Sequence, residues 1–355
     1  MISEQLSPRL ESWSKGEEAI EVLDQTRGFG GDFVSAYIFG TDGATTFFQD
    51  LHRGTDMIKC FSGILNGLFW RTEMPALTVW LHLCGIHLVP QSTIDEQEQL
   101  ENMCLDLCRS AEKTYRPEEE PLTVYAQLRT NLALSGLSGE LLEKTVAAEL
   151  LDQIFAAVHG IGLTLTYAMF QLSRNPSIQT KLRGELIDAD EEQKSSSESM
   201  TKQDLPVLRA VLRETMRVHP ASPGPTFRVT PAKITHIGPY PNIPTDTTVS
   251  ACSYTLHKGP PFPHPEEWRP ERWLESDEHE LKEMNRWFWG FGSGARGCIG
   301  NEISLYAMEQ FLAAVYLNYE TSIAKASDME QMDGLFGIPK DRELWLAFRK
   351  AEPLS

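Results

Sequence analysis

The glycine-rich segment from Phe291 to Gly300 holds residue types that could do chemistry. Its sequence, FGSGARGCIG, places four glycines around one cysteine, Cys298. Glycine permits strained loops in which backbone amides crowd around a sulfur, and a helix predicted to begin near Gly300 sets its positive end beside the thiol. These surroundings favour a thiolate, which can be a nucleophile, a redox sensor or a metal ligand. The segment alone does not distinguish these three uses.

The spacing of five residues in this segment resembles the haem-binding signature of the cytochrome P450 family. Phe291, Gly294, Arg296, Cys298 and Gly300 occupy its defining positions. The resemblance implies that Cys298 is the axial ligand of a haem iron, whose thiolate donates electron density that favours cleavage of a bound O–O bond. It also implies that loop amides hydrogen-bond the sulfur. The alternative is a buried free thiol, a common state of cysteine.

A second resemblance concerns a buried network of charges. Glu214 and Arg217 match the family's Glu-x-x-Arg motif, and Arg272 lies in the segment that supplies its second arginine. Residues three apart share a helix face, so Glu214 and Arg217 can share hydrogen bonds with Arg272. We expect a structural network rather than a catalytic one. The alternative is an exposed pair that contributes little.

Two arginines are suited to the propionates of a haem. Arg228 lies in a strand-like run, 226–229, that resembles the family's propionate-binding strand, and Arg296 lies in the glycine-rich segment. A guanidinium can bind a carboxylate through two parallel hydrogen bonds. His219 and His257 are interpreted as packing or loop residues, and no chemistry is assigned to them.

A long, largely buried helix is predicted over 141–175. Apolar residues recur there with helical period, and Pro176 ends the run. Two glycines in its middle, Gly160 and Gly162, either let another body approach the helix backbone or permit tight helix packing.

The same helix departs from the family pattern at the place that serves proton delivery. Most family monooxygenases carry an acid followed by an alcohol there, whereas this chain has His159 and Gly160. His159 could substitute as a proton relay, and Thr164, one turn later, is a second candidate. The alternative is that His159 is a packed core histidine.

The elements that position these residues are predicted to be mainly helical. A helix capped by Asp204 carries Glu214 and ends at His219, and the last helix begins near Gly300. The polar stretch 188–204 is predicted to be a mobile surface loop. Short strands are predicted at Thr226–Thr230, Lys233–Ile237 and Thr247–Tyr254. The expected fold is mainly α with a small β component, and it is similar to the cytochrome P450 fold.

Composition excludes several classes of protein. The chain has 355 residues, 41% of them hydrophobic and 23% charged, so it is expected to fold in water. Its net charge of −18 argues against nucleic acid as a partner. The six cysteines show no paired spacing, so neither a zinc site nor a disulfide scaffold is indicated. A reducing compartment is therefore expected.

The amino-terminal part gives expectations about location. The first residues lack the basic cluster and apolar run of a signal peptide. Two apolar stretches, Gly63–Trp70 and Leu77–Val89, are shorter than a membrane span and are interpreted as core helices. The alternative is that Ser62–Val89 forms a substrate entrance or a membrane-touching surface. We expect a protein that is cytoplasmic or peripheral to the endoplasmic reticulum, without a transmembrane segment.

The resemblance is weak before Leu141 and strong after Asp204, and it implies a single shortened domain over 1–355. That domain lacks the family's N-terminal anchor, early sheet and early helices. The implied activity is a monooxygenase that inserts one oxygen atom from O2 into an apolar small molecule, in natural-product biosynthesis, with electrons from an NADPH-dependent reductase. One alternative is a haem-thiolate isomerase, dehydratase or peroxide-using enzyme without the usual proton relay. Another is a haem-poor, inactive remnant.

Overall fold

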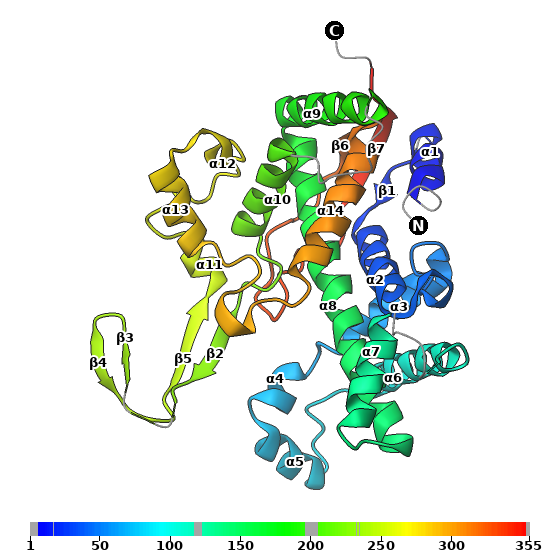
Figure 1. Cartoon of the computed structure of the whole chain (residues 1–355), viewed down its shortest axis with the longest axis vertical. Helices are drawn as coiled ribbons and strands as arrows, with labels where there is room; N and C mark the ends of the chain where they lie inside the picture. The colour runs from blue at the N-terminus through cyan, green and yellow to red at the C-terminus, as the bar shows by residue number, and fades with distance from the viewer. Residues whose placement is uncertain are drawn as a thin grey trace. The chain divides into compact units, whose positions relative to one another are not determined.

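The computed structural model describes residues 6–16, 18–116, 123–195, 205–231, 233 and 235–352. The chain divides into two compact units, one of Met1–Thr166 with Glu343–Phe348, the other of Tyr167–Arg342 with Arg349–Ser355. Figure 1 shows helices as the dominant elements, with a few short strands. The prediction of a mainly α fold with a small β component is confirmed.

The first unit is built from helices and one short pair of strands. Strand β1 pairs antiparallel with β7, with Ile20 opposite Leu346. Helix α2 packs against α3, α6 and α7. The elements of this unit are α1 (Ser7–Lys15), β1 (Ile20–Glu21), α2 (Leu23–Phe39), the 3-10 turn η2 (Thr41–Gly43), α3 (Leu51–Gly63), α4 (Leu68–Thr72), α5 (Pro75–Leu83), α6 (Gln91–Glu112), α7 (Val124–Leu134), most of α8 (Gly139–Arg174) and most of β7 (Trp345–Lys350).

Glycines let the backbones of α2 and α8 approach closely. A Cβ at Gly162 of α8 would lie 2.7 Å from the Cα of Arg27, and one at Gly30 of α2 would lie 2.7 Å from the carbonyl oxygen of Ala157. Real Cβ atoms do not tolerate such distances, so these two positions require glycine. Gly162 therefore serves tight helix packing, which is one of the two roles expected for the glycines of α8.

The second unit surrounds helix α10, which packs against α9, α12 and α14. Strand β2 pairs with β5, and the β3–β4 hairpin lies away from the helices of this unit in Figure 1. The elements of this unit are α9 (Pro176–Ser195), α10 (Pro206–Val218), β2 (Pro225–Val229), β3 (Thr235–Ile237), β4 (Tyr240–Ile243), β5 (Thr248–Cys252), α11 (Ser253–Leu256), α12 (Arg272–Glu275), α13 (Glu278–Trp287), η3 (Gly294–Arg296), α14 (Asn301–Tyr316) and β6 (Tyr319–Lys325).

The start of α10 differs from the sequence expectation. Asp204, predicted as the cap, lies outside the described residues, and the helix begins at Pro206. Its first free amides, those of Val207 and Leu208, instead donate to the carboxylate of Glu185 at 2.7 and 2.9 Å. A carboxylate from α9 thus satisfies the helix start and complements its positive end.

Two expectations about local structure are corrected. Helix α9 continues to Ser195, so residues 188–195 of the predicted mobile loop are helical, and 196–204 lie outside the described residues. The stretch around α5 is not a core helix, because Val79, Trp80 and Leu83 are 61%, 60% and 79% exposed. Among the described elements α5 packs mainly on the short helix α4, which cannot cover its apolar side chains.

Helix α8 is the one element among the described residues that has the length and composition of a membrane span. Its 18-residue window has a mean hydropathy of 1.4, and 56% of that window is buried inside the protein. A buried core helix passes the same test, as the sequence expectation of a largely buried helix implies.

Candidate functional site

The cysteine segment forms a closed loop directly before α14. Gly292 and Gly294 have φ angles of 69° and 73°, in the region where only glycine is unstrained. The amide of Cys298 donates to the carbonyl oxygen of Phe291 at 2.8 Å, which closes the loop. Helix α14 begins at Asn301, so its positive end lies next to the cysteine, as predicted.

The surroundings of the Cys298 thiol are open. The thiol is free and exposed, and the following residue, Ile299, is 95% exposed. A Cβ at Gly300 would lie 3.7 Å from the sulfur, and one at Gly294 would have no atom within 4 Å. The loop therefore leaves the sulfur accessible to a large group, so the residues around Cys298 fit its role as a ligand of a haem iron. The alternative considered for Cys298, a buried free thiol, does not agree with this exposure.

The two arginines expected at the propionates lie in the same unit as the loop. Arg228 is on β2, opposite Val249 of β5, and Arg296 ends the turn η3. Both side chains are exposed, and every residue of β2 is exposed. Exposed guanidiniums are available for carboxylates of a bound group. The described residues of this unit therefore fit a haem.

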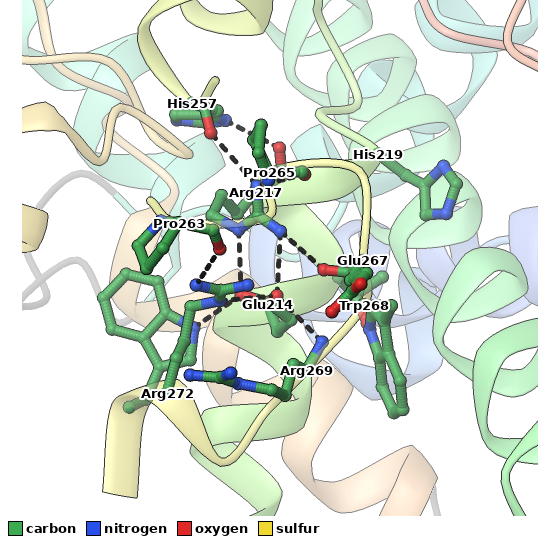
Figure 2. Close-up of polar contacts among 12 residues, drawn as sticks. Glu214, Arg217, His219, His257, Pro263, Pro265, Glu267, Trp268, Arg269 and Arg272 are labelled. Atoms are coloured by element: carbon green, nitrogen blue, oxygen red, sulfur yellow. Dashed lines mark hydrogen bonds and ion pairs between the residues drawn. The ribbon is translucent and has the colours of Figure 1, made fainter. Parts of the chain in front are cut away.

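Glu214 is the centre of a buried charge network (Figure 2). It is fully buried, as are Arg217 and Arg272. One carboxylate oxygen, Oε1, accepts from Arg217 at 2.8 Å, from Arg272 at 2.9 Å and from the amide of Arg269 at 2.9 Å. The other, Oε2, accepts from Arg217 and from the indole of Trp273, each at 2.9 Å. The structure thus brings the three charged residues together.

Arg217 and Arg272 also donate hydrogen bonds to backbone carbonyls of the segment before α12. Arg217 donates to the carbonyls of Pro265 and Glu267 at 2.7 and 2.9 Å. Arg272 donates to the carbonyl of Pro263 at 3.1 Å. The network therefore helps to fix the path of this irregular loop, which forms no helix or strand. These carbonyl acceptors had no signal in the sequence, because their positions depend on the loop path.

The network extends to a histidine for which the sequence suggested no role. His257 is fully buried, and its backbone carbonyl accepts from Arg217 at 3.0 Å. Its ring nitrogen Nε2 accepts the amide of Trp289 at 2.8 Å. Trp289 lies two residues before Phe291, so this bond reaches the start of the cysteine loop. No sequence spacing predicts it, since the partners are 32 positions apart.

Helix α8 places His159 in the interior of the first unit. Its Nδ1 donates to the carbonyl oxygen of Phe155 at 3.0 Å, and the ring packs on that of Phe155. Burial lowers the pKa of His159 to about 3, and the charge of Arg27 acts in the same direction. The imidazole is therefore neutral near neutral pH. This geometry agrees with the packed core histidine considered as the alternative.

Thr164 and Gly160 lie one turn apart on α8. The Thr164 hydroxyl donates to the carbonyl oxygen of Gly160 at 2.8 Å, and its side chain is buried. Gly160 differs from Gly162, because a Cβ at Gly160 would have no atom within 4 Å. Gly160 therefore borders open space, which leaves room for another body to approach the backbone of α8 there.

Comparison with known proteins agrees with this arrangement. The family model for cytochrome P450 matches residues 61–346. The chain is 34% identical over 229 residues to the cytochrome P450 monooxygenase avaI of Aspergillus versicolor, covering 61% of this chain and 54% of that protein. It is 31% identical over 205 residues to the cytochrome P450 monooxygenase FGM1 of Gibberella zeae, covering 57% and 40%.

A human protein is also similar. The mitochondrial 25-hydroxyvitamin D-1 alpha hydroxylase of Homo sapiens is 33% identical over 185 residues, covering 51% of this chain and 35% of that protein. The chain thus spans about half the length, or less, of the curated relatives it matches.

Proposed function

Since the chain belongs to the cytochrome P450 family, we propose that it is a haem-thiolate monooxygenase that inserts one oxygen atom from O2 into an apolar small molecule. The observation that carries the proposal is the loop around Cys298. It presents one exposed thiol beside open glycines and the positive end of α14. That combination has no use in an ordinary protein core.

The proposed roles of the loop residues follow from their chemistry. Cys298 binds the haem iron, and a thiolate-bound haem supplies the activation of dioxygen. Gly300 keeps the space beside the sulfur open, Gly294 adopts the positive φ angle that the loop requires, and the carbonyl of Phe291 holds the backbone of Cys298.

Two further sets of residues support the haem in this proposal. Arg228 and Arg296 bind the propionates through paired hydrogen bonds. The Glu214 network fixes the segment before α12, so it is structural rather than catalytic.

Proton delivery is the step for which α8 departs from the family. The pKa of His159 is lowered to about 3, so the ring carries no imidazolium proton to donate near neutral pH, and its one N–H is directed at the carbonyl of Phe155. Thr164 is the remaining hydroxyl candidate, and its proton is directed at the carbonyl of Gly160. This observation favours a second candidate function, a haem-thiolate isomerase, dehydratase or peroxide-using enzyme that needs no such relay.

The proposed partners are an apolar substrate and an NADPH-dependent reductase. Two of the relatives are fungal monooxygenases of this family, which supports an oxidation in natural-product biosynthesis. We place the protein in the cytoplasm or at the surface of the endoplasmic reticulum. The exposed apolar side chains of α5 suit peripheral contact with a membrane.

Product analysis with labelled oxygen tests the proposal. The purified chain, supplied with haem, a reductase and a panel of apolar small molecules under ¹⁸O₂, should yield products that carry one ¹⁸O atom. Cys298→Ala should abolish them, and Cys84→Ala, which removes another exposed free thiol, should not. Turnover with peroxide alone, and never with the reductase, would establish the second candidate instead. A chain that binds no haem would contradict both.

A further inference from the structure

His257 joins two parts of the second unit through three hydrogen bonds. Its Nδ1 lies 3.1 Å from the carbonyl oxygen of Arg217, at the end of α10. Its backbone carbonyl accepts from the Arg217 side chain at 3.0 Å. Its Nε2 lies 2.8 Å from the amide nitrogen of Trp289. The ring is fully buried and stacks on Phe288, with centroids 5.3 Å apart and planes at 12°.

These contacts determine the protonation of the ring. The carbonyl of Arg217 can only accept, so Nδ1 must carry a proton. The amide of Trp289 can only donate, so Nε2 must be free of one. A single neutral tautomer satisfies both, and burial lowers the pKa of His257 to about 4, which keeps the ring neutral.

The Trp289 amide is the first fixed point of the cysteine loop. The carbonyl of the same residue accepts from the amide of Gly292 at 3.0 Å, which makes the first turn of the loop. The carbonyl of Phe291 then accepts from the amide of Cys298 at 2.8 Å. One hydrogen bond from the Trp289 amide to the His257 ring and two backbone hydrogen bonds within the loop therefore connect His257 to the residue that presents the thiol.

We propose that His257 is a positioning residue for the Cys298 loop: its neutral ring ties the loop start to the buried network of Glu214 and Arg217. Arg217 is held by the carboxylate of Glu214, and its own carbonyl and guanidinium hold His257 from two sides. The ring in turn holds the amide of Trp289 through a hydrogen bond to its Nε2. The link to haem ligation rests on the proposed role of Cys298, whereas the link to the loop backbone does not.

Two substitutions separate this role from simple packing. The side-chain amide of asparagine reaches about as far as Nδ1 of histidine, and that of glutamine about as far as Nε2. His257→Asn therefore keeps a donor to the Arg217 carbonyl and loses the acceptor for Trp289, while His257→Gln keeps that acceptor. Both remove the ring that stacks on Phe288, so a packing role predicts equal effects.

Hydrogen exchange in the chain without haem is the first test. In His257→Asn, amides of 289–298 should exchange about tenfold faster than in the unsubstituted chain, because the loop start has lost its acceptor. In His257→Gln they should stay within about threefold. Amides in the middle of α14 serve as an internal control and should not change. Equal exchange in the two variants would overturn the proposal.

The tautomer of the unsubstituted protein is a second test, which needs no variant to fold. In two-bond ¹H–¹⁵N correlations, the ring assigned to His257 through its own backbone resonances should be neutral, protonated at Nδ1 and bare at Nε2. Protonation of that ring at Nε2, or at both nitrogens, would refute the role of His257.

The haem-loaded protein gives the functional consequence. In the reduced carbon monoxide difference spectrum, the thiolate-ligated fraction should fall in His257→Asn and be retained in His257→Gln. Equal fractions in the two variants would refute the effect of the loop on ligation. Absence of the thiolate band from the unsubstituted protein, with the exchange results as expected, would instead contradict the proposed function and leave the backbone link established.

Discussion

Replacing Glu214 by glutamine should destabilise the protein strongly, because the carboxylate has no spare acceptor. Five donors converge on its two oxygens, and four of them come from side chains. If the remaining oxygen of Glu214→Gln takes the place of Oε1, the new amide group faces two other donors, Nε of Arg217 and the indole N–H of Trp273. Two guanidiniums also lose their counter-charge inside the protein.

The magnitude follows from these contacts. Each buried donor left without an acceptor costs about 1–3 kcal/mol, and removing one member of a buried ion pair costs about 3–5 kcal/mol. The backbone carbonyls of Pro265 and Glu267 still bind Arg217 and limit the loss. We expect the free energy of unfolding to fall by about 3–5 kcal/mol, and Tm by roughly 4–7 °C.

Urea unfolding followed by tryptophan fluorescence is the assay, since Trp273 contacts Glu214 directly. Glu309→Gln is the matched control, because Glu309 pairs with Arg209 at 3.1 Å and the two side chains are 16% and 33% exposed rather than fully buried. It should cost at most about 1 kcal/mol. Equal, small losses in the two variants would refute the view that Glu214 organises a buried network.

Three further predictions concern the first unit. Gly162→Ala should destabilise the protein by about 1–3 kcal/mol, since the new Cβ would lie 2.7 Å from the Cα of Arg27. Gly160→Ala should stabilise it by up to about 1 kcal/mol, because a Cβ at Gly160 would have no atom within 4 Å. Chemical denaturation measures both changes, and equal effects of the two substitutions would contradict the assigned packing. Burial raises the pKa of Asp32 to about 7, so its contribution to stability is present at low pH and is lost as the pH rises from about 4 toward 7. Between those pH values the free energy of unfolding of the unsubstituted protein should fall, relative to that of Asp32→Asn, by up to about 1.4 kcal/mol per pH unit. Parallel pH profiles of stability for the two proteins would contradict the raised pKa of Asp32. The ring of His159, with its pKa lowered to about 3, should show no NMR titration between about pH 5 and 8, and a midpoint in that range would restore it as a proton donor.

The sequence predicted elements and motifs better than it predicted their contacts. Helical periodicity located α8 and α14, and the Glu-x-x-Arg spacing located the centre of the charge network. The partners of that network were not predictable, because the carbonyls of Pro263 and Pro265 are brought there by an irregular loop. His257 was missed for the same reason, since its two ring partners are 40 and 32 positions away.

Apolar composition was a poor guide to burial in one region. Val79 and Leu83 belong to a strongly apolar stretch, which predicted a core helix, yet both are exposed. Burial requires a second element that packs on the apolar face, and composition carries no information about that element. The two glycines of α8 illustrate the same limit, because only the position of Arg27 distinguishes Gly162 from Gly160.

The reduced carbon monoxide difference spectrum tests the central claim most directly. The chain loaded with haem should give the red-shifted band that thiolate ligation produces. Cys298→Ala should abolish that band, while Cys84→Ala should leave it unchanged, since both positions carry exposed free thiols and only one lies in the glycine loop. Persistence of the band in Cys298→Ala, or its absence from the unsubstituted chain, would contradict the account.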